Sequence, residues 1–178
     1  SEEAVVWRGP MLAKMIEQFL NNVDWGELDY LVLDLPPGTG DIQLTLCQST
    51  PLTGAAVVST PQDVAFNVAR KAILMFNQLH TPVLGIIENM SSYGCSHCGE
   101  QENIFGEGGG EKASKEFDVP FLGSIPLTTD IRITSDEGKP IVLAKPESAE
   151  AKAFITVAEN LAAQVSIQNL ADKNKEIK

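Results

Sequence analysis

The stretch LDYLVLDLPPGTGD, residues 28–41, decides how the rest of this sequence is interpreted. Its residues 30–33, YLVL, form a short continuous apolar run, which is typical of a parallel strand buried on both faces. The run stops at Asp34, and the residues that follow are too rich in proline and glycine to continue a strand. Because open α/β sheets bind their ligands at the carboxyl ends of their strands, Asp34 is a candidate functional residue.

Asp34 and the glycines after it suit the chemistry of a nucleotide site. A carboxylate can hold Mg²⁺ through water, and Gly38 and Gly40 allow the backbone to approach a phosphate. This is the layout of a Walker B aspartate followed by a loop that senses the nucleotide, so Asp34 and Gly38 are our candidate catalytic residues. An aspartate that only ends the strand and caps the next turn fits the same pattern equally well.

Strand and helix patterns alternate along the chain, which predicts an α/β fold with a mostly parallel sheet and helices on both faces. A long loop is expected from Met90 to Gly110, because it is rich in glycine and serine. The expected strands cover residues 4–7, 30–33, 54–58, 82–87 and 120–125, and the expected helices begin at Pro10, Ile42, Pro61, Lys112, Thr129 and Ser148.

The 178-residue chain is acidic, with a formal net charge of −11, and 43% of its residues are hydrophobic. We expect one domain over residues 1–170, followed by a frayed polar tail over residues 171–178. The negative charge argues against a nucleic-acid or anionic membrane surface, because both need clustered lysine and arginine. No apolar run approaches the ~20 residues of a membrane span. The 3 cysteines do not suit a secreted disulfide framework, so the cytoplasm is the expected compartment.

Cys95 and Cys98 form a CxxC pair inside the expected loop. Two thiolates at this spacing can bind one metal or one edge of a cluster, whereas a redox pair or two plain surface thiols are the alternatives. Cys47, on an expected helix, suits a small core residue better. A closed site needs four ligands, and two chains related by a dyad would supply Cys₄. This number of ligands therefore favours a metal centre shared by a homodimer through the CxxC loop.

The sequence contains no glycine-rich phosphate loop of the form GxxxxGK[ST]. Residues 106–114, GEGGGEKAS, come nearest, but Glu111 precedes Lys112 and Ala113 follows it. The backbone N–H groups and the lysine of such a loop supply most of the affinity for phosphates. We therefore expect this chain alone to hydrolyse no ATP.

Five segments of the sequence stand out in this order: LVLDLPPGTGD (31–41), STPQD (59–63), GIIENM (85–90), CSHCG (95–99) and GSIPL (123–127). Taken together, they resemble the Mrp/ApbC family of MinD-like deviant P-loop ATPases. The resemblance covers nearly all of residues 7–161.

The resemblance implies a P-loop NTPase fold of the MinD type, with the Walker A loop lying well before Trp7, so that the chain looks like the C-terminal part of a longer protein. It implies that ATP and Mg²⁺ bind to the intact protein. Asn89 matches the family's adenine-contacting asparagine, although an ordinary turn asparagine is the alternative, and Ile125, Pro126 and Leu127 match the segment that flanks the base.

The resemblance also implies a function for Cys95 and Cys98. In this family the CxxC bridges a labile [4Fe–4S] cluster between subunits for delivery to apo iron–sulfur proteins, and zinc in the same Cys₄ site is the chemical alternative. The leading hypothesis is an iron–sulfur cluster carrier whose cluster transfer is coupled to ATP binding and hydrolysis in the intact protein. The alternatives are a MinD/ParA-like positioning ATPase and a zinc-binding structural fragment.

Overall fold

The computed structural model describes residues 9–35, 40–95 and 98–176 of the chain. The contacts within the chain divide it into two compact units, Ser1–Leu52 and Thr53–Lys178. The expected strand over residues 4–7 and the candidate residue Gly38 lie outside the described residues.

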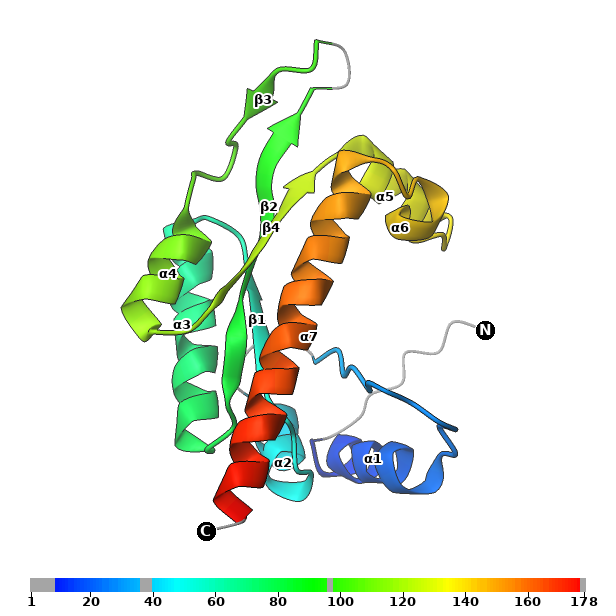
Figure 1. Ribbon diagram of the computed structural model, residues 1–178, viewed down its shortest axis with the longest axis vertical. Helices are drawn as coiled ribbons and strands as arrows, with labels where there is room; N and C mark the ends of the chain where they lie inside the picture. The colour runs from blue at the N-terminus through cyan, green and yellow to red at the C-terminus, as the bar shows by residue number, and fades with distance from the viewer. Residues whose placement is uncertain (1–8, 36–39, 96–97, 177–178) are drawn as a thin grey trace. The chain divides into compact units, whose positions relative to one another are not determined.

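The described residues of the first unit form two helices, and residues 23–35 after the first of them have no regular structure (Figure 1). α1 (Gly9–Asn22) forms where the spacing of apolar residues predicted a helix, and α2 (Asp41–Ser49) covers the short helix expected from Ile42. After α1 the chain is held by the indole of Trp25, whose Nε1 donates to the carbonyl oxygen of Phe19 at 3.0 Å. Leu46 of α2 is 1% exposed.

Residues 30–33 do not form the buried strand that their apolar run predicted. Residues 23–35 contain no helix or strand, and Tyr30 and Val32 are 54% and 81% exposed. A strand buried on both faces needs hydrogen-bonded neighbours, and the described residues of the first unit form no strand to pair with it. An apolar run therefore becomes a strand only where such partners are present.

The second unit is built on a sheet in which β2 is central. β1 and β4 are both parallel to β2 and pair with it. The short β3 is antiparallel to β2 and pairs with its end. In chain order the elements are β1 (Ala55–Ser59), α3 (Asp63–Gln78), β2 (Val83–Gly94), β3 (Gln101–Glu102), α4 (Gly109–Phe117), β4 (Phe121–Leu127), α5 (Thr129–Asp136), α6 (Ile141–Ala144) and α7 (Ala149–Glu176).

Helices cover both faces of this sheet: α3 and α4 lie on one side, and α7 lies on the other (Figure 1). The prediction of a mostly parallel sheet with helices on both faces is confirmed. The core forms where the apolar residues of the strands meet these helices. Its most deeply buried side chains include Ile73, Ile86, Ala113, Leu122 and Ala151, each at most 1% exposed.

α7 begins directly after Ser148, the residue that the sequence predicts as its cap. Ser148 Oγ accepts from the backbone N–H of Ala151 at 3.1 Å, as an N-cap side chain does. Asn160 ties the helix to the sheet by donating from Nδ2 to the carbonyl oxygen of Leu122 at 2.9 Å. The helix continues to Glu176, whereas a frayed tail was expected from residue 171. Once a helix is nucleated and packed, each added residue gains a hydrogen bond, and residues 171–176 contain no glycine or proline to stop it.

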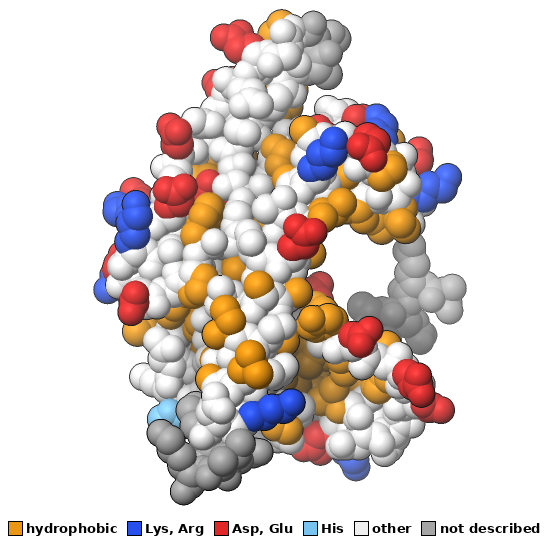
Figure 2. All heavy atoms as spheres, viewed as in Figure 1, with side chains coloured by type: hydrophobic (Ala, Val, Ile, Leu, Met, Phe, Trp, Pro, Cys, Tyr) orange, Lys and Arg blue, Asp and Glu red, His pale blue; other side chains and the backbone are white. Residues whose placement is uncertain are grey.

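Basic and acidic side chains are interspersed around α5, α6 and α7 (Figure 2). Arg132 and Asp136 form an ion pair at 2.8 Å, and Lys145 pairs with Asp130 at 2.5 Å. These exposed pairs contribute little to stability, but they neutralise the positive charge of this surface. No helix in the part of the chain that the structure describes combines the length and apolar character needed to cross a bilayer.

Candidate functional site

The carboxyl ends of three parallel strands lie side by side along one edge of the sheet in the second unit. Ser59 of β1 pairs with Glu88 of β2, and Glu88 pairs on its other side with Ser124 of β4. One residue further, Asn89 pairs with Ile125. The structure therefore brings Asn89 and Ile125 together at the carboxyl ends of parallel strands, where α/β sheets bind their ligands.

The other two candidate base-side residues, Pro126 and Leu127, complete the end of β4 and are half-buried. The side chain of Asn89 is fixed beside them, because its Oδ1 accepts from the backbone N–H of Met90 at 2.9 Å. An amide in this orientation still has its –NH₂ group to donate. The arrangement can present apolar surface and a hydrogen-bond donor to a flat heteroaromatic ring.

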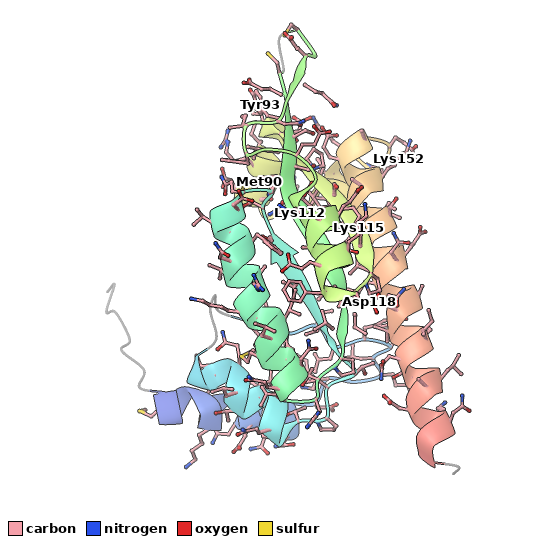
Figure 3. The ribbon with its side chains drawn as sticks, turned by 90° about the vertical axis from the view of Figure 1, so that its left-hand side faces the viewer. Met90, Tyr93, Lys112, Lys115, Asp118 and Lys152 are labelled. Carbon is pink, nitrogen blue, oxygen red and sulfur yellow. The ribbon has the colours of Figure 1, made fainter. Side chains whose placement is uncertain are left out.

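β2 changes direction immediately after this edge. Met90 has a positive φ of 56°, which is uncommon for a residue other than glycine, and the register between β2 and β4 shifts between Asn89 and Tyr93. Ser91 fixes the departing strand by donating from Oγ to the carbonyl oxygen of Ile125 at 3.3 Å. β2 continues beyond the shift through Met90 and Tyr93 (Figure 3), and Tyr93 still pairs with Leu127 of β4.

The segment expected as a loop from Met90 to Gly110 is partly a β-hairpin. β2 continues to Gly94 and pairs with β3, with Tyr93 opposite Glu102 and Gly94 opposite Gln101. The sequence did not predict this because β3 is only 2 residues long and has no apolar alternation. We call residues 90–95 and 98–108 the cysteine arm, and this arm extends beyond the rest of the sheet (Figure 1).

The CxxC pair lies at the far end of the cysteine arm. The backbone N–H of Cys95 donates to the carbonyl oxygen of Glu100, and that of Gly99 donates to the carbonyl oxygen of Cys95, both at 2.9 Å. These bonds hold Gly99 and Glu100 against Cys95. Cys95 is half-buried and Cys98 is exposed, whereas residues 96–97 lie outside the described residues.

One chain brings two thiol donors to this turn. Within residues 9–35, 40–95 and 98–176, no three or more His, Cys, Asp and Glu side chains gather to hold a metal ion. Cys47, the third cysteine, is half-buried on α2 of the first unit and is not part of the arm.

Asp34, the candidate Walker B residue, is exposed in the first unit. It borders a hollow of about 190 Å³ whose other lining residues are apolar and come from α1, the segment before residue 36, and α2. These residues are Ile16, Val32, Leu33, Leu35, Ile42 and Leu46. A carboxylate at the rim of an apolar hollow is accessible to a hydrated cation, so the role assigned from the sequence stays a prediction.

Glu88 is a residue that sequence reasoning did not single out. It is 4% exposed, and its Oε2 accepts from the backbone N–H of Gly110 at 2.7 Å. The available signal was a charged residue at the end of the apolar run of β2, followed downstream by the glycines at residues 108–110. In the sequence those glycines match only part of a phosphate loop, and the structure places the last two in the first turn of α4.

Comparison with known proteins places this chain in a family. The model of the NUBPL iron-transfer P-loop NTPases, of the ParA group, matches residues 1–162. The chain belongs to this family. The assignment confirms the resemblance to the MinD-like P-loop ATPases.

Relatives of this NUBPL-family chain carry names that describe iron–sulfur clusters. The iron–sulfur cluster transfer protein NUBPL of Dictyostelium discoideum is 46% identical over 177 residues, 99% of this chain and 54% of the relative. The iron–sulfur cluster carrier protein of Escherichia coli K12 is 51% identical over 164 residues, 92% of this chain and 44% of the relative. The chain thus spans about half the length of the curated relatives it matches.

Solved structures agree with the NUBPL-family assignment and with the predicted P-loop NTPase fold of the MinD type. A nucleotide-binding protein from Archaeoglobus fulgidus, in complex with ADP, has a TM-score of 0.68 and 43% identity over 80% of this chain and 57% of that protein. The cell division ATPase MinD of Pyrococcus furiosus has a TM-score of 0.64 and 25% identity over 90% of this chain and 63% of that protein.

Proposed function

We propose that this chain is the cluster-binding part of an iron–sulfur cluster carrier, in which ATP binding and hydrolysis by the intact protein are coupled to cluster transfer. The observation that carries the proposal is the position of the CxxC pair. Cys95 and Cys98 lie on an arm that begins at Met90, directly after Asn89, the candidate base-side residue. One strand, β2, therefore connects the candidate nucleotide edge to the candidate cluster ligands.

The donor chemistry of the arm supports an iron–sulfur cluster bound between two chains. Iron–sulfur clusters of the [4Fe–4S] type are held by four cysteine thiolates, and each chain supplies Cys95 and Cys98. A homodimer joined through the tips of the two arms completes the set. Zinc in the same Cys₄ site is the alternative cargo, because tetrahedral thiolate sites suit both.

The nucleotide edge supports ATP as the ligand of the intact protein. Asn89 would donate to the adenine ring, and Ile125, Pro126 and Leu127 would flank it. Asp34 would hold Mg²⁺ through water, with Gly38 on the loop that follows. The A. fulgidus neighbour, which was solved with ADP, supports nucleotide binding at this fold.

The partners of this carrier are apo iron–sulfur proteins that accept the cluster. Exposure of Cys98 favours this role, because an incoming thiolate must reach iron to displace the donor thiolate. The paired charges around α5 to α7 and the net charge of −11 disfavour nucleic acid and anionic membranes as partners. A single domain over residues 1–170, a cytoplasmic location and the lack of ATP turnover by this chain alone belong to the same proposal.

A positioning ATPase of the MinD/ParA type shares the fold but is supported less well. The P. furiosus MinD structure is 25% identical to this chain, whereas the two curated relatives named for iron–sulfur clusters are 46% and 51% identical. The CxxC pair has no use in a positioning ATPase. The carrier is therefore the function that we propose.

Cluster transfer is the experiment that tests this proposal. The chain is loaded anaerobically with iron and sulfide, re-purified and mixed with an apo ferredoxin, and the iron–sulfur absorption and circular dichroism of the acceptor are followed. We expect the acceptor to gain its cluster while the chain loses its own, and a chelator present throughout should not prevent the transfer. Transfer no faster than from free iron and sulfide, measured in a parallel sample, contradicts a carrier function.

A further inference from the structure

A buried carboxylate lies at the base of the cysteine arm. Glu88 is 4% exposed, and its Oε2 accepts from the backbone N–H of Gly110 at 2.7 Å. Burying a carboxylate is costly unless the group is hydrogen-bonded, and a bond this short is typical of a charge-assisted one. A buried carboxylate that accepts such a bond therefore has a specific task in the structure.

The bond from Gly110 satisfies the start of α4, which has no cap of its own. The first N–H groups of a helix lack partners within the helix, and a side chain at the N-cap usually accepts from one of them. The N-cap of α4 is Gly108, with a φ of +69° and no side chain to accept such a bond. Glu88 supplies the acceptor from β2 instead, and its negative charge also complements the helix dipole.

The glycines of α4 make this contact possible. A Cβ on Gly110 would lie 2.9 Å from the Cβ of Glu88 and 2.8 Å from Cε2 of Phe121. A Cβ on Gly109 would clash with the carbonyl oxygen of Pro61, which follows β1. The start of α4 is thus pressed against β2, β4 and the residues after β1 at distances that only glycine allows.

Glu88 therefore joins the strand that enters the cysteine arm to the helix that follows it. The arm begins at Met90, two residues after Glu88, and ends at Gly108, two residues before Gly110. We propose that Glu88 is a positioning residue that clamps the two ends of the cysteine arm together and thereby sets the direction in which Cys95 and Cys98 are presented. The proposal rests on the proposed function, since it assigns the clamp to the arm that would hold the cluster.

The remainder of α4 is fixed independently of Glu88. The ring of Phe117 lies 6.1 Å from the ring of Phe66 of α3, centroid to centroid, and Arg70 lies over the Phe117 ring at 5.7 Å. Arg70 also pairs with Glu116 at 3.5 Å. Removing the Glu88 carboxylate is therefore expected to release the start of α4 and the arm, and to leave the helix itself in place.

Hydrogen exchange at the Gly110 amide tests the clamp directly in the metal-free chain. Glu88→Ala should exchange this amide on the order of tenfold faster than the wild type, the factor expected for loss of a hydrogen bond to a charged group. Glu88→Gln keeps an oxygen acceptor of the same shape and should restore most of the protection. Glu111→Ala is the matched control, because Glu111 is an exposed glutamate in the first turn of the same helix.

A nitroxide on Cys98 reports the arm itself, in a background where Cys47 and Cys95 are both serine. We expect Glu88→Ala to sharpen the electron paramagnetic resonance spectrum of the label, because the released arm moves more freely. Gly110→Ala should do the same, since its added methyl pushes α4 away from Glu88. Glu88→Gln and Glu111→Ala should leave the spectrum close to that of the parent.

These two measurements decide the proposal through Glu88→Ala or, where that variant does not fold, through Gly110→Ala. If Glu88→Ala folds and matches the wild type in both exchange and label mobility, Glu88 does not position the arm. If Glu88→Ala does not fold, Gly110→Ala carries the same test, and an unchanged label spectrum in that variant overturns the clamp. Both measurements are made without metal, so failure of the wild-type chain to load a cluster counts against the proposed function alone.

Discussion

Replacing Cys95 or Cys98 by serine is expected to abolish iron–sulfur loading of this chain almost completely. Each substitution removes two of the four thiolates from a site shared by two chains, and a serine hydroxyl does not replace a thiolate as a soft ligand. The measurement is anaerobic reconstitution with iron and sulfide, followed by the charge-transfer absorption of the re-purified protein. We expect little absorption to remain in either variant.

Cys47→Ser is the matched control for these substitutions. Cys47 is half-buried on α2 and lies outside the cysteine arm, so this variant should load a cluster as well as the wild type. Loss of the cluster in Cys47→Ser together with retention in Cys98→Ser would reverse the assignment of the ligands.

Asp34→Asn is expected to reduce ATP turnover on the order of a hundredfold in a form of the protein that also contains a glycine-rich phosphate loop. A carboxylate that holds Mg²⁺ through water acts mainly on the reacting state, so turnover should fall more than nucleotide affinity. Cluster loading should persist, because the thiolates lie on a separate element. Steady-state turnover and nucleotide affinity are measured together with the melting temperature of the same preparation.

Asp29→Asn is the control for this prediction, because Asp29 is an exposed aspartate of the same irregular segment. It should leave turnover unchanged. If Asp34 only ended its segment of chain, Asp34→Asn would lower the melting temperature modestly and leave turnover per folded molecule intact. That result contradicts the Walker B role.

The strands of the second unit were predictable from sequence because each combines an apolar run with partners inside the same unit. Residues 54–58, 82–87 and 120–125 were expected as strands, and β1, β2 and β4 include nearly all of them. The run at residues 30–33 is also apolar, but it has no strand partner among the described residues of its own unit. Composition predicts the tendency to be buried, whereas pairing decides whether the backbone becomes a strand.

The candidate site was predictable where it depends on strand ends, and not where it depends on long-range contacts. Asn89 and Ile125 were assigned separately, and the parallel register brings them side by side. The contact between Glu88 and Gly110 joins residues 22 apart through a side chain and a backbone amide. Neither periodicity nor spacing reports such a contact, because it depends on the glycines that let α4 approach β2.

The most direct test of a cluster shared between two chains is the composition and mass of the reconstituted protein. Iron, acid-labile sulfide and zinc are determined on the re-purified wild-type chain, and its mass is measured under anaerobic native conditions. We expect about four iron and about four sulfide per two chains, carried by a dimer that dissociates when the cluster is removed. Iron carried by a monomer, or zinc without iron after loading in the presence of both metals, would contradict the account.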